Sequence, residues 1–248
     1  MTVDAVFAWL IAPFVGSFLG LVVDRLPVGQ PVLLGRSVCD GCGRPLGVRD
    51  LVPIVSFLVQ RGRARCCGAR LPPFYPMIEI AALVVAVWAS LVVDGWLLWV
   101  TCGLGWTLLV LAWIDLRHFW LPDVLTLPLI PAGLAITYAI GLDRLVGHAI
   151  AAALGFGALA LIAWGYQHVR GREGLGLGDA KLLAGAGAWL GPAALPSVVL
   201  LGAVAGLAAA LAMGRRGAKL RPETAIAFGP WLALAFWVVW LHGPVVIG

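Results

Sequence analysis

Four acidic residues lie inside long apolar segments or at their edges, where an ionisable side chain is costly and therefore points to function. They are Glu79, Asp115, Asp123 and Asp179. Asp115 ends an apolar run, and Asp179 follows two glycines in Gly176-Leu177-Gly178-Asp179-Ala180-Lys181. The other acidic residues lie in loops or at segment ends, where we expect solvation or surface pairing of low energetic worth.

Asp115 and Asp179 are expected to lie at the same face of a membrane. Two apolar segments, 123–141 and 145–167, separate them, and two passages return the chain to the side from which it started. Two carboxyl groups that meet cannot easily both ionise, so such a pair shares one proton. One carboxylate then activates a water molecule while its protonated partner polarises a peptide carbonyl, as in aspartic peptidases.

The surroundings of these residues support a site but also allow simpler roles. Gly176 and Gly178 permit close backbone approach and an irregular helix start, which is tolerated at membrane depth only beside protein or a wet cavity. Asp179 or Asp123 could instead be the N-cap of a helix, and the negative charge of Glu79 could interact favourably with a helix dipole. Lys181 could be an interfacial cation that snorkels to the headgroups.

The cysteines form a second candidate site. Four of the five lie within one short polar segment, as Cys39, Cys42, Cys66 and Cys67. This distribution is more typical of a metal site than of disulfides. The segment is too short for a large core, and a bound metal would compensate for that. Cys102 lies in an apolar segment, where we expect a small buried hydrophobic side chain.

The composition indicates the elements that must position these residues. Of the 248 residues, 62% are hydrophobic and 12% are charged, whereas soluble domains have about 45–50% and about 25%. This excludes an ordinary soluble enzyme, a disordered protein and a secreted disulfide scaffold. Recurring apolar runs of roughly 20 residues also exclude an outer-membrane barrel. The fold class expected is all-α integral membrane, a polytopic helical bundle.

Eight transmembrane helices are predicted, at 4–23, 74–93, 96–116, 123–141, 145–167, 179–195, 197–213 and 225–242. Pro192 and Pro196 separate the sixth from the seventh, and glycines loosen the sixth, so seven helices is an open alternative. We expect three regions: a first transmembrane helix (1–23), a cytoplasmic cysteine-containing module rich in Arg (24–73), and a membrane-embedded bundle (74–248). The N-terminal run is expected to be a retained helix.

The basic residues predict the orientation. Fifteen of the 17 Lys and Arg residues fall in alternate loops on one side, and the opposite loops hold only Arg144. The positive-inside rule places the basic loops, and with them Asp115 and Asp179, at the cytoplasmic face. We therefore interpret the net charge of +5 through topology and the lipid bilayer, and expect no nucleic-acid partner.

Six ordered motifs resemble those of the bacterial type IV prepilin leader peptidase family. Asp115 to Asp123 is similar to its D-x5-L-P-D stretch, and Gly176 to Lys181 to its G-x-G-D-x-K motif. The others are Gly16-Ser17-Phe18-Leu19-Gly20 followed by Arg25-Leu26-Pro27, Ser37 to Cys42, Tyr75-Pro76-Met77-Ile78-Glu79, and Phe228-Gly229-Pro230-Trp231-Leu232-Ala233.

The resemblance implies an aspartyl endopeptidase of the bacterial inner membrane that acts on prepilins or pseudopilins. Asp115 and Asp179 occupy the positions that the family uses for catalysis. Cleavage would follow a Gly that ends a short basic leader, at the cytoplasmic side. In many members the same protein then methylates the new N-terminus, with S-adenosylmethionine as methyl donor. The Arg-rich face would also lie close to anionic lipid headgroups.

The cysteine module departs from the family pattern of two C-x-x-C pairs, which suits a structural zinc ion. Cys39 and Cys42 form an intact pair, but Ala64 stands where the third cysteine is expected, before Cys67. Cys66 is the candidate substitute, so the tentative zinc ligands are Cys39, Cys42, Cys66 and Cys67. The alternative is free thiols in a reducing compartment.

Two other function classes remain open at this point. Buried carboxylates also relay protons or bind cations in membrane transporters and channels. Against this, both aspartates are expected at one face and no inverted repeat is visible. The other alternative is a non-catalytic relative that only binds pilins.

Overall fold

The computed structural model describes residues 2–33, 37–171, 176–215 and 227–245. Within these ranges the regular elements are helices, accompanied only by two isolated β-bridges. All eight predicted apolar segments form helices: α1 (Val3–Arg25), α3 (Phe74–Ser90), α4 (Trp96–His118), α5 (Asp123–Ile140), α6 (Leu145–Arg170), α7 (Leu177–Leu190), α8 (Leu195–Arg215) and α9 (Gly229–His242). The predicted all-α class is confirmed.

Five of these helices are long and apolar enough to cross a membrane. They are α1, α4, α5, α6 and α8, in spans of 18 to 29 residues. The helices α3, α7 and α9 are shorter, with 17, 14 and 14 residues. The multi-pass membrane character predicted from composition is therefore confirmed, while the number of crossings stays a prediction.

The chain divides into two compact units, residues 1–110 and 111–248. Helix α4 passes from the first unit into the second, and its last two turns carry Asp115.

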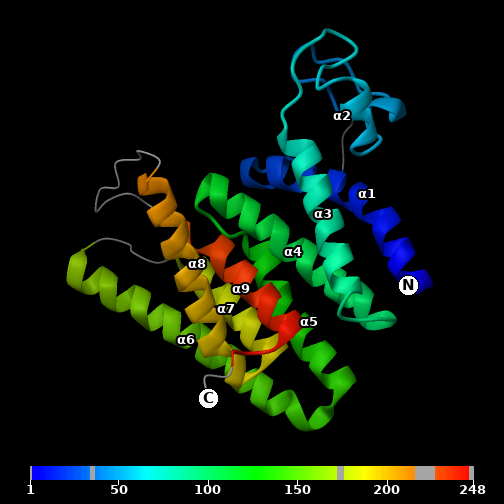
Figure 1. The fold of residues 1–248 in the computed structure, drawn as a ribbon. Coiled ribbons are helices and arrows are strands. Elements are labelled where there is room, and N and C mark those ends of the chain that lie inside the picture. Colours follow the sequence, from blue (N-terminus) through cyan, green and yellow to red (C-terminus); the bar gives the residue numbers. More distant parts are fainter. Residues whose placement is uncertain (1, 34–36, 172–175, 216–226, 246–248) are drawn as a thin grey trace. The chain divides into compact units, whose positions relative to one another are not determined.

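In the first unit, α1 packs along α3 (Figure 1). The two helices approach closely at Gly16, where a Cβ atom would lie 2.6 Å from the Cα of Glu79. Hydrogen bonds tie the pair at both ends. The Trp9 indole N–H donates to Ser90 Oγ at 3.0 Å, and the Tyr75 hydroxyl donates to Asp24 Oδ2 at 2.9 Å. Small residues at such an interface are typical of packed membrane helices.

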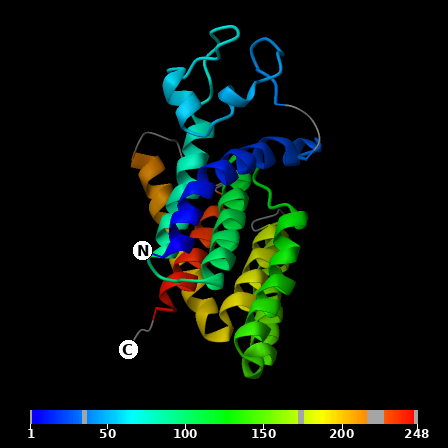
Figure 2. The ribbon, with the colours of Figure 1, turned by 90° about the vertical axis from the view of Figure 1, so that its right-hand side faces the viewer.

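The polar segment between α1 and α3 contains short helices and two hairpin turns. In space it projects past the N-terminal end of α3 (Figure 2). Its helices are η1 (Leu26–Val28), η2 (Val48–Asp50) and α2 (Val55–Val59). The bridges Val38–Pro45 and Arg63–Arg70 close the hairpins.

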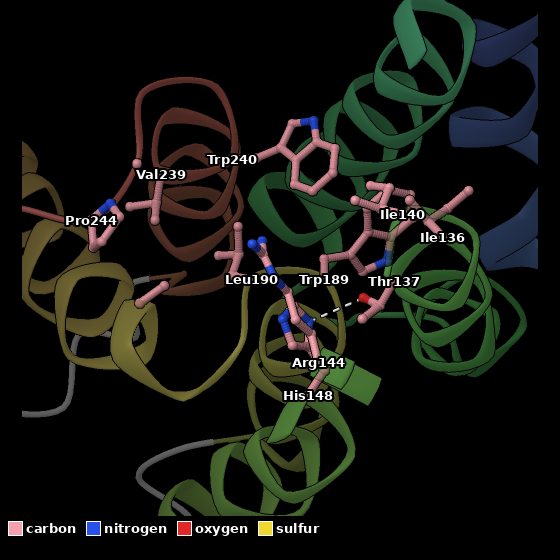
Figure 3. A pocket seen from close by; sticks show the side chains of 12 residues that line it. Ile136, Thr137, Ile140, Arg144, His148, Trp189, Leu190, Val239, Trp240 and Pro244 are labelled. Atoms are coloured by element: carbon pink, nitrogen blue, oxygen red, sulfur yellow. Dashed lines mark hydrogen bonds between the residues drawn. The ribbon is translucent and has the colours of Figure 1, made fainter. Parts of the chain in front are cut away.

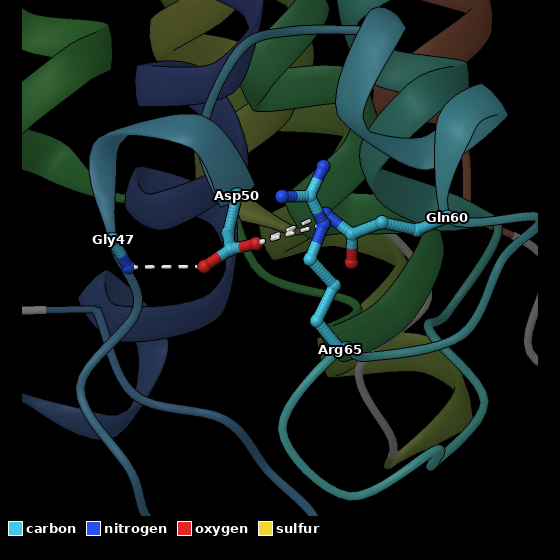
Figure 4. A network of polar contacts seen from close by, with 4 residues as sticks. All are labelled: Gly47, Asp50, Gln60 and Arg65. Carbon is cyan, nitrogen blue, oxygen red and sulfur yellow. Dashed lines mark hydrogen bonds and ion pairs between the residues drawn. The ribbon is translucent and has the colours of Figure 1, made fainter.

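Asp50 connects three parts of this segment (Figure 4). Its carboxylate accepts hydrogen bonds from the N–H of Gly47 and the amide of Gln60, both at 3.2 Å. Arg65 Nε lies 3.6 Å from Asp50 Oδ1. The surface pairing expected for Asp50 is therefore observed, and it links η2, α2 and the second hairpin.

In the second unit, α7 is the central helix and contacts α5, α6 and α9, while α8 pairs with α9 (Figure 1). Ten of the eleven residues of α7 from Asp179 to Trp189 are buried, and Lys181 is the exception. Glycines bring the backbones together: a Cβ at Gly155 of α6 would lie 2.7 Å from the carbonyl oxygen of Leu183. This packing places the first turn of α7, which carries Asp179, among the other helices.

Candidate active site

Asp115 lies near the end of α4 and is nearly buried, with 6% of its surface exposed. Its Oδ2 accepts a hydrogen bond from the backbone N–H of Gly229 at 3.0 Å. Gly229 is the first residue of α9, so this N–H is one that the helix itself leaves without a partner. A Cβ at position 229 would lie 2.7 Å from the same carboxylate oxygen, so only glycine lets the backbone come this close.

Asp179 lies in the first turn of α7 and is 7% exposed. Gly176 is the N-cap, with φ −75° and ψ 142°, and its backbone is a hydrogen-bond partner of the Asp179 carboxyl group. The other oxygen, Oδ1, is buried and has no hydrogen-bond partner among the described residues. Asp179 is thus more than a helix-capping residue, because one of its two oxygens remains unsatisfied inside the protein.

The two carboxyl groups belong to one site, because a single side chain contacts the glycine beside each of them. Leu121, in the turn between α4 and α5, packs against both of their glycine supports. Its side chain would lie 2.8 Å from a Cβ at Gly178 and 3.1 Å from one at Gly229. The site is therefore assembled from the end of α4, the following turn and the starts of α7 and α9.

Lys181 and Asp123 form an ion pair beside this site. Lys181 Nζ lies 2.6 Å from Asp123 Oδ1, and the two side chains are 24% and 58% exposed. Asp123 is the first residue of α5 and makes no capping hydrogen bond, because Pro122 occupies the N-cap. The capping role considered for Asp123 is therefore not observed. The exposed pair contributes little stability, but it connects the start of α5 to the first turn of α7.

Glu79 lies in the first unit and is 6% exposed. Its Oε2 accepts the backbone N–H of Ile54 at 2.6 Å. Glu79 is beyond the first turn of α3, so the helix-dipole role considered for it is wrong. Ile54 has φ +60° and ψ −53°, and Val55 N–H donates to Pro53 O at 2.5 Å, which together define a γ-turn. Glu79 therefore anchors a strained turn of the polar segment to α3.

The two hairpins of the cysteine segment have the same backbone pattern. In the first, the N–H of Cys39 donates to Arg44 O and the N–H of Gly43 donates to Cys39 O. In the second, Ala64 bonds to Ala69 O, and Gly68 to Ala64 O. Gly43 and Gly68 have φ +69° and +73°. Ala64 therefore occupies the position that Cys39 holds in the first hairpin, as the sequence predicted.

Cys66 supplies the fourth thiol in place of Ala64. The Sγ atoms of Cys39, Cys42, Cys66 and Cys67 all lie within 4.8 Å of one another. Cys42 and Cys66 are 3.3 Å apart, and Cys39 and Cys67 are 3.6 Å apart. Tetrahedral zinc with sulfur ligands at about 2.3 Å requires sulfurs about 3.8 Å apart, so the four thiols fit a zinc ion.

Hydrogen bonds shift the pKa values of the thiols in this cluster in opposite directions. The backbone of Gly41 lowers the pKa of the Cys39 thiol to about 7. The hydrogen bond to Cys42 raises the pKa of Cys66 to about 12. A zinc ion would bind all four groups as thiolates, so its binding would release the protons of these thiols.

Comparison with known proteins decides the family. Residues 10–93 match the family model described as the bacterial peptidase A24 N-terminal domain, and residues 102–211 match the type IV leader peptidase family. The prepilin leader peptidase/N-methyltransferase of Aeromonas hydrophila is 36% identical, over 95% of this chain and 89% of its own length. The chain belongs to the type IV leader peptidase family.

Other members of the leader peptidase family agree with this assignment. The protein of the same name from Burkholderia pseudomallei strain 1026b is 38% identical over 92% of this chain and 82% of its own length. That from Klebsiella pneumoniae is 39% identical over 75% of this chain and 85% of its own length. No solved structure matches. The resemblance read from six sequence motifs is therefore confirmed.

Two contributors to the site were not recognised from the sequence. In the sequence, Gly229 stands out only as part of the Phe228-Gly229-Pro230 motif, and Leu121 only as part of the stretch that follows Asp115. Both act through contacts with residues distant in sequence. The sequence signal for Gly229 is its place directly after Phe228, at the start of the last helix.

Proposed function

We propose that this chain is an aspartic endopeptidase that removes the short basic leader from type IV prepilins and pseudopilins, with Asp115 and Asp179 as its catalytic pair. The observation that carries the proposal is two buried carboxyl groups, from α4 and α7, whose neighbouring glycines Gly229 and Gly178 both contact Leu121. The names of its relatives, prepilin leader peptidase/N-methyltransferase, support the substrate class.

The hydrogen-bond partners favour a division of roles. The Gly229 N–H stabilises negative charge on Asp115, and the unpartnered Oδ1 of Asp179 is the place for the shared proton. Asp115 takes a proton from water, and the water oxygen attacks the carbonyl carbon of the scissile peptide. Asp179 donates its hydrogen bond to the carbonyl oxygen. Collapse of the tetrahedral intermediate breaks the C–N bond, and the leaving amine takes up the proton.

The site is proposed to face the cytoplasm, in a multi-pass protein of the bacterial inner membrane. Arg117 follows Asp115 closely, and Arg170 ends α6 shortly before Asp179 in the chain, as the positive-inside rule requires of cytoplasmic ends. Residues 24–73 would then form a cytoplasmic module and 74–248 the peptidase bundle. Five basic residues of this orientation argument, Arg36, Arg172, Arg216, Lys219 and Arg221, lie outside the described residues.

Zinc is the metal that we propose for the cysteine cluster. Cys39, Cys42, Cys66 and Cys67 would hold it, and the ion would join the two hairpins without taking part in peptide cleavage. N-methylation of the new N-terminus with S-adenosylmethionine is the second activity proposed, since the relatives carry that name and the thiols converge despite Ala64. We assign no residues of this chain to the methyl donor.

The decisive experiment is mass spectrometry of a co-expressed pilin-like substrate. Wild type, Asp115→Asn and Asp179→Asn are compared with Asp143→Asn, a matched control because Asp143 is exposed at the opposite end of α5. Only wild type and the control should remove the leader. Cleavage by Asp115→Asn at the wild-type rate contradicts the assignment. Uncut substrate with folded wild type and a cognate pilin favours a transporter or a pilin-binding protein.

A further inference from the structure

A cavity of about 250 Å³ lies in the second unit, at the end of α7 distant from Asp179. The end of α5, the start of α6, the end of α7 and the end of α9 surround it (Figure 3). Trp189, which lines it, is about 15 Å from Asp179 along α7, at 1.5 Å rise per residue. The cavity is therefore separate from the aspartate pair and has no part in peptide cleavage.

Two residues that line this cavity, Thr137 and His148, converge on one backbone carbonyl, that of Ala188. Ala188 would bond to the N–H four residues later, but that residue is Pro192, which has none. His148 Nδ1 lies 3.0 Å and Thr137 Oγ1 3.2 Å from Ala188 O. A carbonyl oxygen only accepts, so the His148 contact is a hydrogen bond in the tautomer that carries its proton on Nδ1. Thr137 Oγ1 donates to the same carbonyl and also lies 3.1 Å from His148 Nδ1. The polar groups of Thr137 and His148 that face Ala188 are therefore used within the protein, where they join α5 and α6 to the end of α7.

Arg144 is the polar side chain that this arrangement leaves available. It lies one helical turn before His148, so the two side chains share a face and both line the cavity (Figure 3). Arg144 is exposed and forms no ion pair with the acidic residues in the described part of the chain. The neighbouring Asp143 turns towards Gly141, with Oδ1 2.8 Å from the position of a Cβ there.

The position of Arg144 in the sequence makes its charge informative. It is the one basic residue in the loops opposite the Arg-rich side, where membrane proteins carry few cations. A guanidinium group presents several donors in a planar fork that matches phosphate oxygens. A lone unpaired arginine at the end of a membrane bundle therefore favours an anionic, phosphate-bearing ligand.

The remaining walls favour a ligand with an apolar part. Ile136, Ile140 and Val239 line the cavity together with Trp189 and Trp240, whose rings meet edge to face at 5.2 Å between centroids. Tryptophans near the ends of membrane helices lie at the level of the lipid headgroups. The volume is below the roughly 300–1,000 Å³ of pockets that enclose a whole drug-sized ligand.

We propose that this cavity binds the phosphate of a membrane phospholipid in the leaflet opposite the Arg-rich loops. Arg144 donates hydrogen bonds to the phosphate oxygens, and the glycerol end of the lipid lies against Ile140 and Trp240. The acyl chains remain in the bilayer, which is why a small cavity suffices. The site ties a lipid to the ends of four helices at the face distant from the aspartates.

Native mass spectrometry of the full-length protein in detergent, with added phosphatidylglycerol, tests this proposal. Wild type is compared with Arg144→Gln and with Arg170→Gln, a matched control that removes an exposed charge from the other end of α6. Arg144→Gln should weaken the tightest lipid association by about tenfold or more, as expected for charge-assisted hydrogen bonds. Arg170→Gln should retain it, and Arg144→Lys should retain part of it.

Two results would overturn the proposal. Equal lipid retention by wild type and Arg144→Gln would mean that the lipid binds without Arg144. Equal loss in both glutamine variants would mean that the lipid responds to overall positive charge and not to this cavity. Inorganic phosphate and glycerol 3-phosphate separate a lipid from a free anion. Neither should displace the lipid at equal concentration, and displacement by either would show that the cavity recognises a soluble phosphate instead. Unchanged thermal stability of Arg144→Gln shows that any loss is not due to unfolding.

Discussion

The backbone N–H of Gly229 donates a hydrogen bond of 3.0 Å to Asp115 Oδ2, joining residues 114 positions apart in the sequence. The start of α9 thus fixes the orientation of a carboxyl group carried by α4. A donor aimed at one carboxylate oxygen leaves the other free for water or substrate. This relationship gives the phenylalanine-glycine-proline motif at 228–230 a specific physical role.

Replacing Gly229 by alanine should disable cleavage while leaving the protein folded. The new Cβ would lie 2.7 Å from Asp115 Oδ2 and 3.1 Å from a Leu121 methyl group, so the carboxyl group must move. Misplacement by about 1 Å can cost roughly 100-fold in rate. The measurement is the initial rate of leader removal from a purified pilin-like substrate.

The control for this substitution is Gly157→Ala in α6, where a Cβ would meet nothing within 4 Å. Its rate should match that of wild type. A Gly229→Ala enzyme of full activity would show that this close approach is not needed for catalysis.

The cysteine cluster should lose zinc when Cys66 is replaced by serine, because three thiolates and a hydroxyl bind zinc less well than four thiolates. Adding Ala64→Cys to this variant should restore zinc binding. Ala64 occupies the backbone position equivalent to Cys39, so a thiol there completes the second C-x-x-C pair. Elemental analysis of purified protein, in moles of zinc per chain, measures both effects.

Cys102→Ser is the matched control, since Cys102 is buried in α4 away from the cluster. It should not change the zinc content. Zinc retained in full by Cys66→Ser would instead mean that Cys66 is not a ligand, and the vicinal cysteine pair would then need another explanation.

Removing the carboxylate of Glu79 should release the turn at Ile54. In Glu79→Ala the part-buried N–H of Ile54 loses its acceptor at 2.6 Å, and a γ-turn with positive φ at a β-branched residue is strained without such support. We expect a loss of about 1–3 kcal/mol in stability and faster amide hydrogen exchange in residues 51–60. Hydrogen exchange monitored by mass spectrometry detects the local change.

Asp24→Asn serves as the comparison, because Asp24 contacts α3 through Tyr75 at the same side of the first unit. It should leave exchange in residues 51–60 unchanged. Wild-type protection of Ile54 in Glu79→Ala would show that the turn is held by its own sequence.

The interface between α6 and α7 should not tolerate a side chain at Gly187. A Cβ there would lie 2.5 Å from the carbonyl carbon of Ala151, and backbone cannot move aside as a flexible side chain can. Gly187→Ala should lower the unfolding temperature in detergent, with a free-energy cost of about 1–3 kcal/mol. Gly165→Ala, which meets no atom within 4 Å, should not lower it, and equal effects of the two would argue against tight packing at this point.

Much of the fold could be predicted because membrane helices are encoded locally. A run of apolar residues predicts a helix wherever it occurs, so all eight helices were found, with ends within a few residues except at the N-terminal side of α9 and the C-terminal side of α7. Parity of crossings predicted one face for Asp115 and Asp179, and the resemblance to a family with two C-x-x-C pairs identified Ala64 as the exception in the cysteine module.

The sequence by itself determined the class of protein, the apolar helices and the acidic and thiol groups available for chemistry. Only the tertiary structure decided that Gly229 supports Asp115, that Cys66 turns into the thiol cluster, and that His148 and Thr137 serve the carbonyl that Pro192 leaves unpaired. The reason is that hydropathy reports how each segment meets lipid or water, one segment at a time. Which backbone N–H or carbonyl meets which side chain depends on the packing of helices that are distant in the chain.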